Sequence, residues 1–211
     1  MLAMAHEIRR ETSGGRRRYF AGDELIGPSV TTILDGVFGL PAKVDAETWR
    51  LAGLRGQAVH EAIHLLEGGV DDASLDWETL HPDIEPYLLG YDAFRSEHDW
   101  RPELLEQPVI HRSFHYGGTL DAIGLLDGVP MLADWKSGIA LGRHAAQTAA
   151  YKAAVIESEL VEHGDMLGRM TVYLKPNASY SIVKHTKQGD WYDFAAAMRV
   201  YDRKEKADGK Y

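Results

Sequence analysis

The chain of 211 residues contains no cysteine. Disulfide bonds, zinc–thiolate sites and cysteine-ligated iron–sulfur clusters are therefore excluded. No apolar run approaches the roughly 20 residues needed to span a bilayer. The opening segment, MLAMAHEIRRETSGGRRRYF, lacks the apolar stretch of a secretory signal. These absences predict a cytoplasmic protein with no membrane partner and no iron–sulfur cofactor.

Positive charge is also scarce, with 23 basic residues against 32 acidic residues and a formal net charge of −9. This balance argues against a protein that coats nucleic acid through bulk charge alone. It does not exclude an enzyme that acts on nucleic acid, because carboxylates that hold metal ions add to the negative total. Five of the 23 basic residues gather in an N-terminal basic arm, about residues 1–18; they are Arg9, Arg10, Arg16, Arg17 and Arg18. The arm is compatible with a solvated, partly mobile segment and with a phosphate-binding one.

No internal repeat, low-complexity block or long linker divides the chain, so we expect a single domain over residues 1–211. Apolar residues at helical spacing predict a helix that follows Asp45, an N-cap residue, and stops at Gly68. Further helices are predicted over residues 82–98, 143–164 and 190–206, and strands near 16–28, 103–138, 169–176 and 179–186. This order predicts an α/β fold in which helices flank a central mixed β-sheet.

The segment GGTLDAIGLLDGVPMLADWKSG carries the most informative pattern. Asp127-Gly128 is typical of a type I′ hairpin turn, which needs positive φ at both central residues. This turn places Asp121 opposite Asp134, with Cβ atoms about 4.5 to 5.5 Å apart. Lys136 lies two residues beyond Asp134 and so shares its face of the strand.

Opposed carboxylates repel each other unless a cation or a proton lies between them. Two interpretations stay open on this segment alone. The acids could occupy a solvated strand end, with Lys136 as a salt-bridge partner. They could instead bind a hard divalent cation, since magnesium prefers one or two carboxylates together with water and substrate phosphate.

Two helical segments carry further polar residues at four-residue spacing. Gln147 and Tyr151 share one face of an alanine-rich helix, and Gly56 and His60 share a face of the helix that follows Asp45. The same helix contains HEAIH, in which His60 and His64 could bind zinc with Glu61 as general base.

Taken in order, these elements resemble the RecB-like branch of the PD-(D/E)XK nuclease superfamily, which includes phage exonucleases. The matching pieces lie between residues 53 and 155. They are G-x-x-x-H at Gly56–His60, G-x-x-D at Gly118–Asp121, D-x-K at Asp134–Lys136 and Q-x-x-x-Y at Gln147–Tyr151. Leu120 replaces the proline of the first nominal motif. The resemblance implies a restriction-endonuclease-like core, and it makes His60 part of G-x-x-x-H rather than of a zinc helix.

The resemblance also implies a function and its residues. It implies a nuclease, more specifically an exonuclease, that uses Mg²⁺ or Mn²⁺ on linear DNA ends during recombination, repair or phage DNA processing. His60, Asp121 and Asp134 would bind the metal, together with the main-chain carbonyl of Trp135. Lys136 would orient the attacking water or stabilise the phosphate, and Gln147 and Tyr151 would position Lys136 and the DNA backbone. The protein partner would be a second copy of the chain or a recombination protein.

Two other functions are considered. A zinc metallopeptidase would use His60, Glu61 and His64, with His81 or Glu85 as a third ligand, but it leaves the hairpin acids unexplained. A catalytically inactive DNA-binding protein of the same fold is the second alternative, and the complete Asp-Asp-Lys set argues against it.

Overall fold

Five strands form the central sheet, in the order β4-β5-β6-β7-β8. The computed structural model describes residues 8–13, 16–39, 41, 44–68 and 81–209. The strands span Trp100–His111 (β4), Tyr116–Leu126 (β5), Val129–Lys136 (β6), Gly168–Leu174 (β7) and Tyr180–Lys184 (β8). β6 and β7 are parallel, whereas the other neighbours are antiparallel, so the sheet is mixed as predicted.

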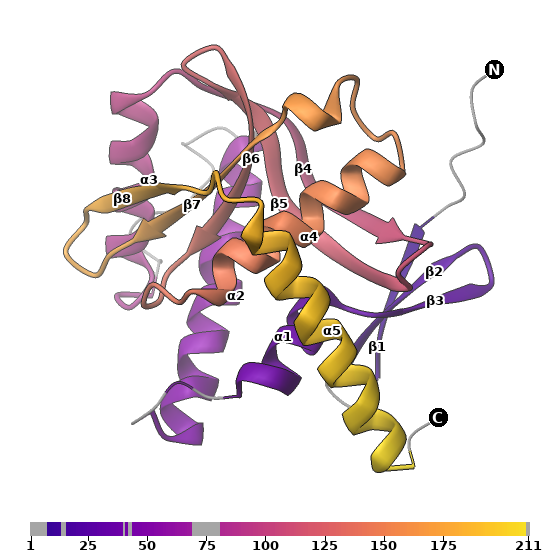
Figure 1. Cartoon of the computed structure of the whole chain (residues 1–211). Coiled ribbons are helices and arrows are strands. Elements are labelled where there is room, and N and C mark those ends of the chain that lie inside the picture. The colour runs from indigo at the N-terminus through magenta and orange to yellow at the C-terminus, as the bar shows by residue number, and fades with distance from the viewer. Residues whose placement is uncertain (1–7, 14–15, 40, 42–43, 69–80, 210–211) are drawn as a thin grey trace.

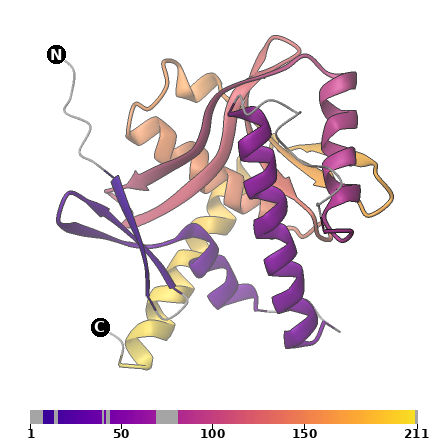
Figure 2. The ribbon, with the colours of Figure 1, turned by 180° about the vertical axis from the view of Figure 1, so that it is seen from behind.

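Helices cover both faces of this sheet (Figures 1 and 2). They span Val30–Phe38 (α1), Ala46–Glu67 (α2), Glu85–Glu97 (α3), Arg143–Glu157 (α4) and Gly189–Ala207 (α5), with a short 3₁₀ turn at Gly164–Met166. One apolar core joins α1, α4 and α5 to the sheet, and a second joins α2 and α3 to it. The predicted fold class is therefore confirmed. Among the described residues, no helix is long and apolar enough to cross a membrane.

The predicted hairpin between β5 and β6 has the expected turn and register. Asp127 and Gly128 both have positive φ, of 52° and 80°. The register runs from Leu126 opposite Val129 to Ala122 opposite Ala133. The paired ladder ends at Ala122 and Ala133. The next two residues away from the turn are Asp121 and Asp134, and the strands separate there.

The basic N-terminal segment belongs to a second sheet. Its strands β1 (Ile8–Ser13), β2 (Arg16–Ala21) and β3 (Glu24–Pro28) pair in sequence order and lie beside β4 and β5 (Figure 1). Of the two interpretations of the arm, the partly mobile segment does not fit residues 8–13 and 16–18, because main-chain pairing with neighbouring strands holds them. Residues 1–7 lie outside the described part of the chain.

Most predicted helix limits are confirmed, and two differ. Asp45 caps α2 as expected, since its side chain accepts from the Thr48 N–H at 2.9 Å. The helix predicted from residue 82 begins at Glu85, because residues 82–84 form a turn. The helix predicted to reach residue 164 ends at Glu157. Ser158 bonds back to the main chain of α4, and Glu159 adopts positive φ, which terminates the helix.

Candidate metal centre

Three side chains from three elements converge where β5 and β6 separate. One ligand atom each of His60 (α2), Glu106 (β4) and Asp121 (β5) lies within 4.8 Å of the other two. The His60 Nδ1 lies 3.4 Å from the Asp121 Oδ1. We call these three residues the ligand cluster. Imidazole and carboxylate donors without thiolate suit Mg²⁺, Mn²⁺ or Zn²⁺, so the residues present fit a divalent cation.

Asp121 lies at the centre of this geometry. Its Oδ2 accepts a hydrogen bond of 2.8 Å from the Trp135 N–H, while its Oδ1 faces His60. The carboxylate thus takes a position beside β6 where the main-chain ladder stops. Burial favours a higher pKa for Asp121, but the charge of His60 and its hydrogen bond outweigh burial and lower the pKa. Asp121 is therefore an ionised carboxylate in the absence of metal.

His60 is the counterpart of that carboxylate. Burial disfavours its charged form, but the neighbouring Asp121 more than compensates and raises the pKa of His60. In the metal-free protein the two residues form an imidazolium–carboxylate pair at moderately acidic pH. A cation that binds here must displace the proton of His60, since a histidine ligand is neutral.

Glu106 is a site residue that the sequence analysis did not identify. Glu106 lies on β4 between the pairs Leu105–Ala122 and Gln107–Leu120, and this register places it opposite Asp121 on β5. Its φ of 46° is unusual for a residue other than glycine and costs free energy. Burial, and then the charge of Asp121, raise the pKa of Glu106. A second carboxylate that approaches the first at such a cost is typical of a site that holds a cation.

Asp134 lies outside the ligand cluster and is completely buried. Its Oδ1 accepts from the Lys136 Nζ at 2.6 Å and from the Gln147 Nε2 at 3.0 Å. Its Oδ2 is buried and has no hydrogen-bond partner among the described residues. Burial raises the pKa of Asp134 to about 6, against the lowering effect of Lys136, and the charge of Asp121 adds to the rise. An unsatisfied buried carboxylate oxygen is costly, so Oδ2 is an open acceptor for a proton, a water or a cation.

Lys136 is held as an ammonium group. Burial alone would lower its pKa, but the carboxylates of Asp134 and Asp121 raise it. A lysine in this state carries charge and donates hydrogen bonds, and it does not serve as a base. The earlier interpretation of Lys136 as a salt-bridge partner of Asp134 is thus correct in geometry, although the pair is buried rather than solvated.

The second pair of helical residues completes the arrangement from α4. Gln147 donates to Asp134 and also to the Tyr151 hydroxyl, at 3.2 Å. Burial raises the pKa of Tyr151 well above its ordinary value, so the phenol stays neutral.

Trp135 packs its ring among Tyr91 and other aromatic residues of the second core. Metal ligation by its main-chain carbonyl stays a prediction.

The zinc-helix residues do not all join the site. His64 and Glu61 are exposed, and the ligand cluster contains neither of them nor His81 or Glu85. Within the described residues, the only imidazole in the cluster is that of His60. The H-E-x-x-H spelling therefore does not correspond to a formed two-histidine site.

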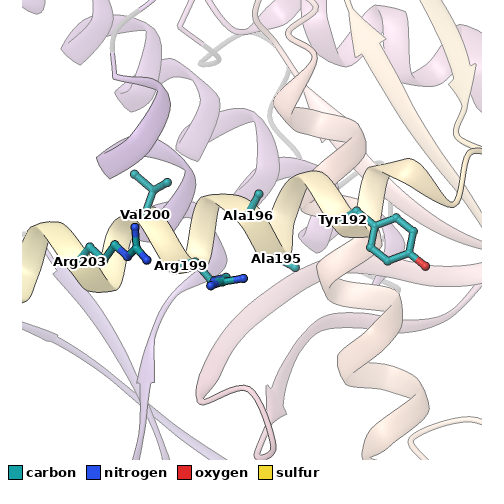
Figure 3. Close-up of a pocket in the computed structure, with 6 residues that line it drawn as sticks. All are labelled: Tyr192, Ala195, Ala196, Arg199, Val200 and Arg203. Carbon is teal, nitrogen blue, oxygen red and sulfur yellow. The ribbon is translucent and has the colours of Figure 1, made fainter.

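Two hollows of the described surface lie away from the ligand cluster. A shallow hollow of about 410 Å³ follows the outer side of α5 (Figure 3). Its lining is Tyr192, Ala195, Ala196, Arg199, Val200 and Arg203. A second, of about 680 Å³, lies between the C-terminal end of α1, the start of α4 and α5. Neither includes a residue of the ligand cluster.

The four sequence motifs thus meet in space. Gly56 lies beside Ser137, since a Cβ added to it would be 3.5 Å from the Ser137 Oγ. His60 contacts Asp121, Gly118 contacts Tyr151, and Asp134 contacts both Lys136 and Gln147. Comparison of the sequence with models of known protein families and with curated proteins found no match.

Proposed function

We propose that the chain is a Mg²⁺- or Mn²⁺-dependent deoxyribonuclease that acts as an exonuclease on linear DNA. The observation that carries the proposal is the ligand cluster of His60, Glu106 and Asp121 beside the buried Asp134–Lys136 pair. A divalent cation held by these acids would supply positive charge at the scissile phosphate and acidity for the attacking water.

The protein's own groups would divide the remaining tasks. Asp121 is held ionised and is oriented by the Trp135 N–H, so it is ready to bind a cation. Lys136 places an ammonium next to the cluster, where it would offset the negative charge that develops on the phosphate. Gln147 fixes the Asp134 carboxylate and leaves its other oxygen open.

The same geometry bears on the two alternatives. Among the described residues, the ligand cluster offers a zinc peptidase one histidine and two carboxylates. This ligand set is harder than the one that zinc enzymes of the two-histidine type use. An inactive DNA-binding protein would have no need of a buried carboxylate with an open oxygen, which costs folding free energy. Both features favour the nuclease.

The proposal is tested with end-labelled linear DNA and covalently closed circular DNA of one sequence. We expect Mg²⁺ or Mn²⁺ to support loss of the linear DNA while the circle survives, and EDTA to stop the reaction. Cleavage of the circle would replace the exonuclease with an endonuclease. Full activity in EDTA, or peptide cleavage restored by zinc alone, would overturn the proposal.

A further inference from the structure

The small sheet is fastened to β5 beside the ligand cluster. The Tyr19 ring occupies the space over Gly117, where an added Cβ would lie 2.4 Å from the ring. The Tyr19 hydroxyl forms a hydrogen bond of 3.0 Å with the Thr119 Oγ1, two residues before Asp121 on the same strand. These contacts hold the β1–β2 hairpin next to the ligand cluster.

Two arginines lie on the same face of the β1–β2 hairpin as Tyr19. Arg10 is paired with Tyr19 across the β1–β2 ladder, and Arg17 lies two residues before Tyr19 on β2. Arg10 is exposed and its Nη1 donates to the Thr119 Oγ1 at 3.4 Å, a long hydrogen bond. Burial raises the pKa of Tyr19, and the nearby charges of Arg17 and Arg10 oppose this rise. Burial also raises the pKa of Glu106, and the charge of Arg10 opposes that rise too.

Arg9 and Arg18 lie on the opposite face of the hairpin. Arg9 pairs with Glu11 and stacks over the Phe20 ring, 4.5 Å from its centroid. Arg18 lies opposite Glu11 in the ladder and is exposed. Among the described residues no ion pair is formed by Arg10 or Arg17, so their charges are available to a ligand.

We propose that Arg10 and Arg17 bind phosphates of the nucleic-acid strand that enters the ligand cluster. This inference rests on the proposed function and assigns the substrate-binding surface of that same site. A chain of net charge −9 with clustered carboxylates repels a polyanion, so local cations must offset the repulsion. Guanidinium groups suit this task because their planar donors match phosphate oxygens.

The test compares two double variants with equal loss of charge, Arg10→Gln with Arg17→Gln and, as matched control, Arg9→Gln with Arg18→Gln. Binding of a labelled single-stranded oligonucleotide is followed by fluorescence anisotropy in EDTA, over a series of salt concentrations. Each phosphate contact contributes about 0.7 to the slope of log K against log salt for single strands. We expect the first variant to lose about 1.4 from the slope, and the control to lose much less.

The outcomes separate this inference from the proposed function. If the wild-type protein cleaves DNA with Mg²⁺ but both double variants keep its slope, or lose equal amounts, the inference alone fails. If the wild-type protein neither binds nor cleaves DNA, both fail. Arg10→Lys with Arg17→Lys controls for damage to the fold, since it keeps the charge. It should retain the wild-type slope, and loss of the slope in this variant would contradict phosphate binding.

Discussion

Gly118 and Tyr151 are in such close contact that no side chain fits between them. A Cβ added to Gly118 would lie 2.4 Å from the Tyr151 Cε1. The glycine of G-x-x-D therefore makes room for the tyrosine of Q-x-x-x-Y, and through Gln147 this contact reaches Asp134. Two motifs that are separate in sequence are thus one packed unit.

This contact predicts the effect of Gly118→Ala. The added methyl group must displace the Tyr151 ring, and overpacking of this kind costs about 1 to 3 kcal/mol of stability. We expect denaturant unfolding to show that loss, and we expect Tyr151→Leu to relieve part of it in the double variant. Gly138→Ala is the matched control, since nothing lies within 4 Å of its added Cβ. Equal stability of the Gly118→Ala and Gly138→Ala variants would contradict the packing argument.

The ligand cluster predicts which residues hold the metal. We expect His60→Ala and Glu106→Gln to weaken Mn²⁺ binding in calorimetric titration, the first by more than about 100-fold because a direct ligand is lost. We expect His64→Ala and Glu61→Ala to change Mn²⁺ binding little, since neither residue belongs to the ligand cluster. DNA cleavage should follow the same order. Severe and equal losses in His60→Ala, Glu61→Ala and His64→Ala would favour the zinc helix instead.

The raised pKa of His60 predicts a pH dependence of metal binding. Its pKa lies above the ordinary histidine value, so the metal-free protein holds a proton there that the cation must displace. Metal affinity should therefore fall as pH drops through that pKa. Calorimetry in buffers of different ionisation enthalpy should show proton release on binding near pH 6.5. Binding without proton release at that pH would contradict the assignment of His60 as a ligand.

A buried histidine outside the cluster predicts a pH dependence of stability. Burial, with a smaller effect of Lys136, lowers the pKa of His144 to about 3, and its Nδ1 forms a hydrogen bond with the Tyr173 hydroxyl. Because the unfolded chain binds this proton near pH 6.5, stability should decline as pH falls from there toward 3. The loss over this pH range is on the order of 5 kcal/mol. Unfolding curves should show a shallower decline for His144→Gln and an unchanged one for His163→Gln, whose side chain is exposed. Parallel declines for wild type and His144→Gln would refute this.

Much of the fold could be predicted because local chemistry decides it. Asp45 caps a helix, and Asp127-Gly128 sets the hairpin register that brings Asp121 and Asp134 to the same end of the ladder. The position of Glu106 could not be predicted in this way. It depends on the pairing of β4 with β5 and on an unusual main-chain conformation, neither of which has a local signal. A lone carboxylate within the apolar run LLEQPVI was the available hint.

The sequence also could not predict that Asp121 and Asp134 have different side-chain partners. Both carboxylates were predicted to bind the metal side by side, and for Asp134, which lies outside the ligand cluster, metal binding stays a prediction. Asp121 joins His60 from α2, whereas Asp134 is held by Gln147 from α4 and by Lys136. The split arises because the helices pack on opposite faces of the sheet, which is a property of the assembled layers.

The measurement that tests the central claim most directly is single-turnover DNA cleavage by Lys136→Ala, with calorimetric metal titration of the same variant. The Lys136 charge lowers the pKa of Asp134, so its loss raises that pKa further, and both experiments are run over a series of pH values that extends to alkaline pH. We predict a rate lower by about 10² to 10³ with metal and DNA binding retained, because the lysine acts on the reacting phosphate or water. Asp134→Asn should instead weaken metal binding and cleavage together. A Lys136→Ala protein that cleaves DNA at the wild-type rate would contradict the assignment of this hairpin as a nuclease site.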